Sequence, residues 1–289
     1  MGKRRETSKP LGIFDSGIGG MTVTMAIKNL LPDEKIVYYG DTARVPYGPK
    51  SPETIIRFSS QICNFLVHRD VKIIVIACNS ASSSSLEHLR NTLSIPVMGV
   101  IEPGARAAVR ATRSGRVAII GTRATVESES YNRAIAALSP DIHVISRACP
   151  LLVPLVEEGW TDFIEAKLIV KRYLHDILRD GVDTIILGCT HYPLLKNVIS
   201  HIAGPGITLI DSAHETALEV RELLAREGLL SLSANGLQGE KHGIASEKCR
   251  YYVSDSPDSF SNACKGLFGT EIENVHKVKV WELSQDPEE

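Results

Sequence analysis

Short apolar runs rich in β-branched residues alternate along the chain with longer segments in which apolar residues recur every three or four positions. The short runs predict strands, because uniformly apolar runs of roughly four to eight residues are typical of buried strands. Two of them, IIVIA and TIILG, are apolar on both alternating faces, as in parallel sheets covered by helices on both sides. The expected strands are 12–15, 35–40, 72–77, 96–101, 117–121, 143–148, 184–188, 207–211 and 250–254.

The longer segments predict amphipathic helices. In one of them Ile55, Phe58 and Ile62 form an apolar stripe. Ser51 can cap the start of this helix, and Pro52 suits its first position. Strand and helix alternate, which predicts a doubly wound α/β fold. The expected helices are 52–68, 81–92, 104–113, 125–138, 162–179, 213–227 and 257–267.

The chain looks like two related halves. LGIFDSG begins at Leu11 and the similar VAIIGTR begins at Val117, 106 positions later. IIVIACNSASS and TIILGCTHYPL each place one cysteine after an apolar run, and these cysteines are Cys78 and Cys189, 111 positions apart. We therefore expect two pseudo-symmetric doubly wound α/β domains that face each other across a central cleft, residues 1–100 and 101–210. Residues 211–289 hold no third copy of the cysteine motif and could extend either half.

Composition and charge are those of an ordinary globular protein: 289 residues, 43% hydrophobic, 23% charged, with a formal net charge of −2. No overall charge attracts nucleic acid or an anionic membrane. The basic start has no long apolar segment after it, which argues against a signal peptide, and no run approaches the roughly 20 apolar residues of a membrane span. Residues 1–9 are expected to form a disordered tail, and the polar, glycine-bearing stretch 231–247 a surface loop.

The six cysteines form no CxxC pair and no regular spacing. Disulfide frameworks belong to small secreted domains, so we interpret these residues as reduced thiols in a cytoplasmic protein. A lone cysteine after an apolar strand usually packs in the core. Cys78 and Cys189, however, both sit at the carboxyl end of a strand, where open α/β sheets bind ligands. Helix-start amides next to them can lower the pKa of a thiol, so we expect both to be functional.

Asp15 and Ser16 follow the first strand and precede several glycines. A dinucleotide fingerprint would need a third glycine where Thr22 stands, although Asp41 lies near the right distance for a ribose-binding acid. Asp15 could also be a turn residue or helix cap, or it could orient a nearby thiol. The turn-rich stretch 38–51 could be only a connecting loop. It also gathers donors that could hold a small anion, namely Thr42, Arg44, Tyr47 and Lys50 beside Gly48.

His191 lies two residues after Cys189, where it could share a proton with that thiol. Cys78, Cys189 and His191 could also be read as metal ligands, but the C-x-H spacing lacks the flanking pattern of structural zinc sites. Glu157 and Glu158 are expected to start a loop after a short helix, and adjacent acids of this kind usually form a solvated pair.

Five motifs occur together in one order: GIFDSGIGG, YYGDTARVPYGPKS, ACNSAS, CPLLVPLVEEG and LGCTHYPLL. In this the chain resembles the glutamate racemases, of the cofactor-independent aspartate/glutamate racemase group, over roughly residues 11–270. One position departs from the family pattern, because Ser80 stands where threonine is usual after ACN. The hydroxyl is kept, so we expect an adjusted contact and not a lost function.

The resemblance implies an isomerase that interconverts L- and D-glutamate and supplies D-glutamate for peptidoglycan, without pyridoxal phosphate or metal. It implies that Cys78 deprotonates D-glutamate with help from Asp15. Cys189 would deprotonate L-glutamate with help from His191, and Glu157 would assist. It also implies a homodimer, with residues 211–289 returning to the first domain. The implied substrate contacts are Asp15, Ser16, Tyr47, Gly48, Asn79, Ser80, Thr190 and His191.

Three other functions stay open at this point. An aspartate-specific racemase is the close competitor, although the CTHYP and PYGPKS stretches favour glutamate. A dinucleotide-dependent oxidoreductase is a different enzyme class, against which the missing glycine counts. A two-lobed protein that binds an amino acid without converting it would leave the paired thiols unexplained. Regulation and dimer geometry do not follow from the sequence, and the ten residues before Leu11 look too short for a regulatory extension.

Overall fold

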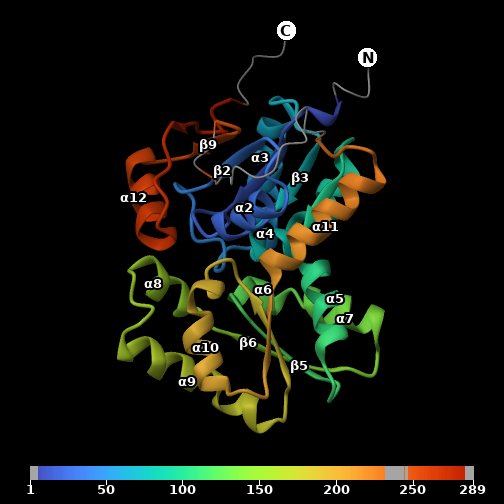
Figure 1. Ribbon diagram of the computed structural model, residues 1–289, viewed down its shortest axis with the longest axis vertical. Coiled ribbons are helices and arrows are strands. Elements are labelled where there is room, and N and C mark those ends of the chain that lie inside the picture. Colours follow the sequence, from blue (N-terminus) through green and yellow to red (C-terminus); the bar gives the residue numbers. More distant parts are fainter. Residues whose placement is uncertain (1–5, 232–243, 245–246, 284–289) are drawn as a thin grey trace.

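The structure is a computed structural model that describes residues 6–231, 244 and 247–283. Its strands form two parallel sheets, one in the upper and one in the lower half of Figure 1. The first sheet has the order β10-β9-β2-β1-β3-β4, with β1 (Leu11–Asp15), β2 (Ile36–Gly40), β3 (Ile73–Ile76), β4 (Val97–Gly99), β9 (Cys249–Val253) and β10 (Val275–Lys277). The second has the order β6-β5-β7-β8, with β5 (Arg116–Gly121), β6 (His143–Ala148), β7 (Thr184–Gly188) and β8 (Thr208–Asp211).

The two sheets repeat one strand order. β1 lies between β2 and β3 with β4 beyond, and β5 lies between β6 and β7 with β8 beyond. All of these pairs are parallel, which confirms the predicted α/β class. The internal repeat seen in the sequence is thus a repeat of topology. It puts the ends of β3 and β7, where the two cysteines follow, at equivalent places.

Helices bury both faces of each sheet. In β1, Leu11 and Ile13 belong to one apolar core and Phe14 to another. In β5, Val117 and Ala118 likewise enter separate cores. The first sheet carries α2 (Met21–Leu30), α3 (Pro52–Val67), α4 (Asn79–Thr92), α11 (Ser212–Arg226) and α12 (Pro257–Phe268), and the second carries α5 (Ile101–Ala111), α6 (Arg123–Glu127), α7 (Ser130–Leu138), α8 (Leu152–Glu157), α9 (Ile164–Arg179), η1 (Tyr192–Leu195) and α10 (Lys196–Ala203).

All the predicted strands are present, but the helices are corrected in several places. The sequence prediction missed α2, η1, α10 and the short strand β10. The helix expected at 125–138 is two helices, because Glu129 has a left-handed backbone (φ 52°) between them. In contrast, α3 begins as expected: the Ser51 side chain accepts a hydrogen bond from the Thr54 amide, and Pro52 is its first residue.

The predicted tail and loop fall partly outside the described residues. Residues 1–5 lie outside them, but the tail prediction was wrong for residues 6–9, which form a turn. There Lys9 pairs with Glu6 and Asp70. Most of the predicted loop 231–247 also lies outside, although Ile244 is buried and its carbonyl accepts a hydrogen bond from the Tyr251 hydroxyl at 2.6 Å.

In the described part of the chain, no helix is both long and apolar enough to cross a membrane.

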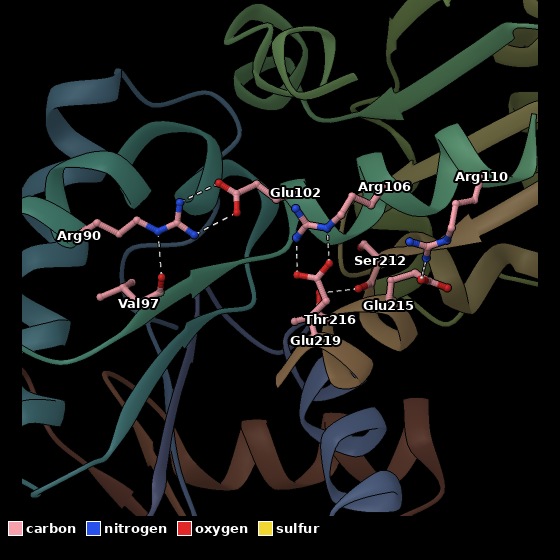
Figure 2. Close-up of polar contacts among 9 residues, drawn as sticks. All are labelled: Arg90, Val97, Glu102, Arg106, Arg110, Ser212, Glu215, Thr216 and Glu219. Carbon is pink, nitrogen blue, oxygen red and sulfur yellow. Dashed lines mark hydrogen bonds and ion pairs between the residues drawn. The ribbon is translucent and has the colours of Figure 1, made fainter. Parts of the chain in front are cut away.

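The sheets are joined twice, from β4 to α5 and from β8 to α11. Three arginine–glutamate pairs lie along these connections (Figure 2). Arg106 and Arg110 of α5 bind Glu219 and Glu215 of α11, and Arg90 of α4 binds Glu102 of α5 at 2.7 Å. The helix α11 packs in the core of the first sheet, and β9 and β10 extend that sheet. We therefore propose residues 1–100 with 211–289, and 101–210, as the two domains.

Asp183, at the start of β7, holds the turn that leads from α5 into β5. Its carboxylate accepts four hydrogen bonds, from the Thr112 hydroxyl (2.7 Å), the amides of Arg113 (2.7 Å) and Ser114 (2.6 Å), and the Thr184 hydroxyl (2.9 Å). Partial burial opposes its charge, but these donors hold the pKa of Asp183 well below its usual range. A carboxylate with a lowered pKa stabilises the fold above its ordinary pKa of 3.8, and this contribution is lost as the pH falls further.

Asp183→Asn is therefore expected to lower the free energy of unfolding by about 1 kcal/mol at neutral pH, less than for buried hydrogen bonds to a charged group because water screens this partly exposed carboxylate. The difference from the unchanged protein should shrink below pH 3.8, where the unfolded carboxyl becomes protonated. Urea unfolding at several pH values measures it. Asp141→Asn, at an exposed position, is the control and should change stability little. A difference that did not vary with pH would contradict the electrostatic explanation.

Candidate active site

The two thiols occupy equivalent positions in the two halves. Cys78 follows β3 and is the N-cap of α4, and Cys189 follows β7 and precedes η1. Each lies next to the end of the central strand of its sheet, where β1 ends at Asp15 and β5 at Gly121. Both thiols are enclosed, with 6% of Cys78 and 5% of Cys189 exposed. The site is therefore closed in this structure.

The surroundings of Cys78 favour the protonated form of its thiol. Its thiol donates to the Ser16 hydroxyl at 3.5 Å, and Asp15 lies near it, fully buried, with one carboxyl oxygen accepting from the Gly17 amide at 2.9 Å. Burial raises the pKa of Asp15, although His191 and nearby amides oppose the rise. Burial and the Asp15 charge raise the pKa of Cys78 to about 12. The expectation that helix-start amides would lower the pKa of Cys78 was wrong, because burial outweighs them.

Cys189 has a different partner. The Cys189 sulfur and His191 Nδ1 are 3.8 Å apart, and His191 Nε2 lies 3.1 Å from a Glu157 oxygen. Burial disfavours a charge on His191, but the hydrogen bonds to Cys189 and Glu157 raise the pKa of His191 to about 10. His191 therefore keeps its proton at neutral pH, and a protonated histidine beside a cysteine is an arrangement that activates thiols in general. Glu157 is therefore not only one member of a solvated acid pair, as its sequence suggested, because it also contacts His191.

The walls of the site touch across the two halves. A Cβ on Gly19 would lie 2.2 Å from the Thr190 hydroxyl and 2.6 Å from the His191 ring, so glycine is needed for this approach. The Thr22 hydroxyl lies 3.2 Å from the Thr190 carbonyl. On the other side, the hydroxyls of Ser80 and Thr122 are 2.9 Å apart. Ser80 therefore keeps a hydroxyl contact at the position that departs from the family pattern.

Two buried polar atoms at the site lack a partner among the described residues: one oxygen of Asp15 and the Nδ2 of Asn79. Buried polar groups are nearly always hydrogen-bonded, so these two atoms are candidates for contact with a ligand at the site. Asp15 and Asn79 are 0% and 2% exposed. The two atoms give the site one acceptor and one donor for a small polar substrate.

The stretch 38–51 is mainly structural. The Tyr47 hydroxyl donates to Asp41, and the Arg44 guanidinium binds the same carboxylate. The Thr42 hydroxyl donates to the Asp255 carbonyl at 2.7 Å. The side chains of Thr42 and Arg44 thus bind other parts of the protein, which favours the structural interpretation of this stretch over the anion-binding one. Asp41 is fully buried and engaged, so it does not serve as a ribose-binding acid, and the dinucleotide interpretation fails there.

Gly48 lies at the edge of the site, because a Cβ on it would be 3.0 Å from the Thr122 side chain. The alternative interpretation of Cys78, Cys189 and His191 as metal ligands finds no support in the structure. Within the described residues, no three His, Cys, Asp or Glu side chains gather to hold an ion. Cys189 and His191 lie together, but Cys78 engages Ser16 instead.

Two site residues were missed in the sequence. Thr122 follows β5 as Ser16 follows β1, and aligning VAIIGTR with LGIFDSG pairs these two positions. The repeat therefore held the signal for Thr122. Tyr131, from α7, reaches Asn79 from the other half and left no such signal.

The family model described as Asp/Glu/Hydantoin racemase matches residues 19–220. The chain belongs to this family. A glutamate racemase of Geobacter metallireducens is 51% identical over 94% of this chain and 97% of its own length. Among solved structures, a glutamate racemase of Bacillus anthracis matches with a TM-score of 0.87 at 38% identity, over 94% of this chain and 97% of that one. One of Francisella tularensis, in complex with D-glutamate, matches with a TM-score of 0.84 at 34% identity, over 95% and 98%. The chain is thus a racemase, an isomerase of the α/β class.

Proposed function

We propose that this racemase interconverts L- and D-glutamate by proton transfer between Cys78 and Cys189. One observation carries the proposal: two buried thiols follow equivalent strands of two related sheets, near enough for the charge of Cys189 to raise the pKa of Cys78, and each has its own hydrogen-bond partner. The similarity of the chain to glutamate racemases supports glutamate, and not aspartate, as the proposed substrate.

The chemistry explains why two thiols are needed. The α-hydrogen of an amino acid is very weakly acidic, and its removal leaves a planar carbanion. Inversion requires a proton from the opposite face, so one group must act as base while another acts as acid. At neutral pH, Cys78 holds its proton, and the protonated His191 lies 3.8 Å from the Cys189 sulfur. In the proposed cycle, Cys189 takes the proton of L-glutamate and Cys78 returns one to the opposite face. The product form, with the protons exchanged, accepts D-glutamate.

The carbanion needs fixed donors near its carboxylate. The start of α4 presents backbone amides beside Cys78, and the unpartnered Asn79 Nδ2 adds one more donor. Asp15 would assist Cys78, while His191 and Glu157 would assist Cys189. We propose as substrate contacts Asp15, Ser16, Tyr47, Gly48, Asn79, Ser80, Thr190 and His191.

Substrate enters only when the halves separate, because both thiols are at least nine-tenths buried. The contacts between Gly19 and Thr190, and between Ser80 and Thr122, would then have to part. Closure around the substrate would exclude water and bring each thiol to about 3–3.5 Å from the α-carbon, the distance that proton transfer requires.

The test is a circular-dichroism assay of L-glutamate with the purified protein and no added cofactor. We expect loss of the signal until equal amounts of the enantiomers are present. In deuterated water, each starting enantiomer should gain solvent deuterium at the α-carbon of its product, because the donating thiol differs from the accepting one. L-aspartate is the control substrate and should react much more slowly. No change of L-glutamate, or faster change of L-aspartate, would contradict the proposal.

We further propose that the enzyme supplies D-glutamate for peptidoglycan, that it works in the cytoplasm, and that it is a homodimer. Thiols such as Cys63, Cys149 and Cys264, buried and free in the structure, suit a reducing compartment. The dimer is supported by family resemblance. Light scattering coupled to gel filtration tests it, since a dimer has twice the mass of the chain.

A further inference from the structure

Tyr131 lies between the two halves of the active site. It is the second residue of α7 and is 1% exposed. Its ring fits between two glycines: a Cβ on Gly104 of α5 would lie 3.2 Å from the ring and its hydroxyl, and a Cβ on Gly188 would lie 3.4 Å from the ring. Any larger residue at Gly104 would press on the ring. The two glycines therefore leave room for one aromatic side chain at this place.

The hydroxyl of Tyr131 crosses to the other half. It donates to the Asn79 Oδ1 at 2.8 Å. Asn79 directly follows Cys78, whereas Gly188, against the other side of the ring, directly precedes Cys189. One side chain thus contacts a residue adjacent to each proposed acid/base thiol.

This hydrogen bond fixes the orientation of the Asn79 amide. With Oδ1 accepting from Tyr131, Nδ2 is the amide atom left without a partner in the described residues. An amide nitrogen can only donate. Glutamate offers acceptors only through its carboxylates, since its ammonium group is itself a donor, so Nδ2 suits a substrate carboxylate. Burial raises the pKa of Tyr131, and a hydrogen bond with Ser212 partly opposes this, so the phenol keeps the proton that it donates. Ser212 is the first residue of α11 (Figure 2).

We propose that Tyr131 is a positioning residue: its hydroxyl holds the Asn79 amide with Nδ2 directed at a substrate carboxylate. This inference rests on the proposed racemisation of glutamate, but it concerns a residue that does not touch the substrate. Without the hydroxyl, the amide can rotate and present its oxygen to the carboxylate, which would repel it.

The variant Tyr131→Phe removes the hydroxyl and keeps the ring between the glycines. We expect kcat/KM for L-glutamate to fall about tenfold, the size of one lost buried hydrogen bond. The loss should appear mainly as a higher KM, with kcat within about threefold of the unchanged enzyme, because the thiols are untouched. Calorimetric titration with D-glutamate should show the same weakening of binding.

A double-mutant cycle separates positioning from a merely structural effect. In Asn79→Ala there is no amide to orient, so adding Tyr131→Phe should change kcat/KM by less than about twofold. If the hydroxyl acted only on the fold, the tenfold loss would persist in the Asn79→Ala background, and the inference would be overturned. Unchanged KM and binding in Tyr131→Phe alone would overturn it equally.

Tyr251→Phe is the matched control. Tyr251 is also 1% exposed, and its hydroxyl also donates one hydrogen bond, to the Ile244 carbonyl. We expect it to lower the thermal midpoint about as much as Tyr131→Phe and to leave KM unchanged. If the unchanged protein did not racemise glutamate at all, the proposed function would fail. If it did, and Tyr131→Phe resembled Tyr251→Phe in KM, the positioning role alone would fail.

Discussion

Replacing Cys78 or Cys189 by alanine is expected to slow racemisation of both enantiomers by about a thousandfold or more, the upper part of the range for losing an acid/base group. Each thiol is the base in one direction and the acid in the other, so neither variant keeps a complete path in either direction. Glutamate should still bind, because the groups proposed to hold its carboxylates remain in place. Circular dichroism measures the rate, and calorimetry measures binding.

The control for this experiment is Cys264→Ala. Cys264 is fully buried in α12, in the core of the first sheet, where burial alone raises the pKa of its thiol to about 12. Its removal should cost some stability and leave kcat unchanged. Interconversion of glutamate at the normal rate by either Cys78→Ala or Cys189→Ala would rule out the two-thiol mechanism. A loss of binding as large as the loss of rate would instead indicate a damaged site.

Local sequence patterns were enough to predict every described strand except the short β10. Runs such as IIVIA and TIILG are rich in β-branched residues and apolar on both alternating faces, which predicts burial of both strand faces, and the structure confirms this. The helix α2 was missed because its first turn contains Thr22, Val23 and Thr24, which favour strands. The break at Glu129 was missed because a left-handed residue other than glycine leaves no clear trace in the sequence.

The sequence was enough to predict the candidate site residues that belong to recognisable motifs. Cys78, Cys189 and Asp15 follow strand ends, and His191 lies near its thiol along the chain. Contacts between the halves were different, because they depend on how the two sheets face each other. The hydrogen bond from Tyr131 to Asn79 joins residues 52 positions apart, on helices α7 and α4 of different halves, and no local pattern predicts it. The pKa of Cys78 was missed for a related reason: burial decides it, and the depth of burial at a strand end cannot be read from the residues around the helix start.

The two thiols differ in their hydrogen-bond partners, and replacing the partner of Cys189 should have the second largest effect on the rate. His191→Gln is expected to lower kcat/KM by about a hundredfold, since Cys189 loses the protonated partner that lies beside its sulfur. The loss must be equal for both enantiomers, because L- and D-glutamate have the same free energy and the ratio of their kcat/KM values is fixed at one. Glu157→Gln should have a smaller effect, about threefold, because that carboxylate is 41% exposed and screened by water.

Alkylation by iodoacetamide reports the same asymmetry directly. The Cys78 and Cys189 thiols are almost equally buried, so differences in their reaction rates reflect the thiolate fraction. In the unchanged protein Cys189 should react faster at neutral pH, because the protonated His191 lies 3.8 Å from its sulfur. Cys78, whose pKa is raised to about 12 by burial, should react slowly, and its rate should increase as the pH rises. In His191→Gln the Cys189 rate should fall at neutral pH, because this cation is gone. Peptide mass spectrometry measures both sites, and equal rates at Cys78 and Cys189 would contradict this assignment.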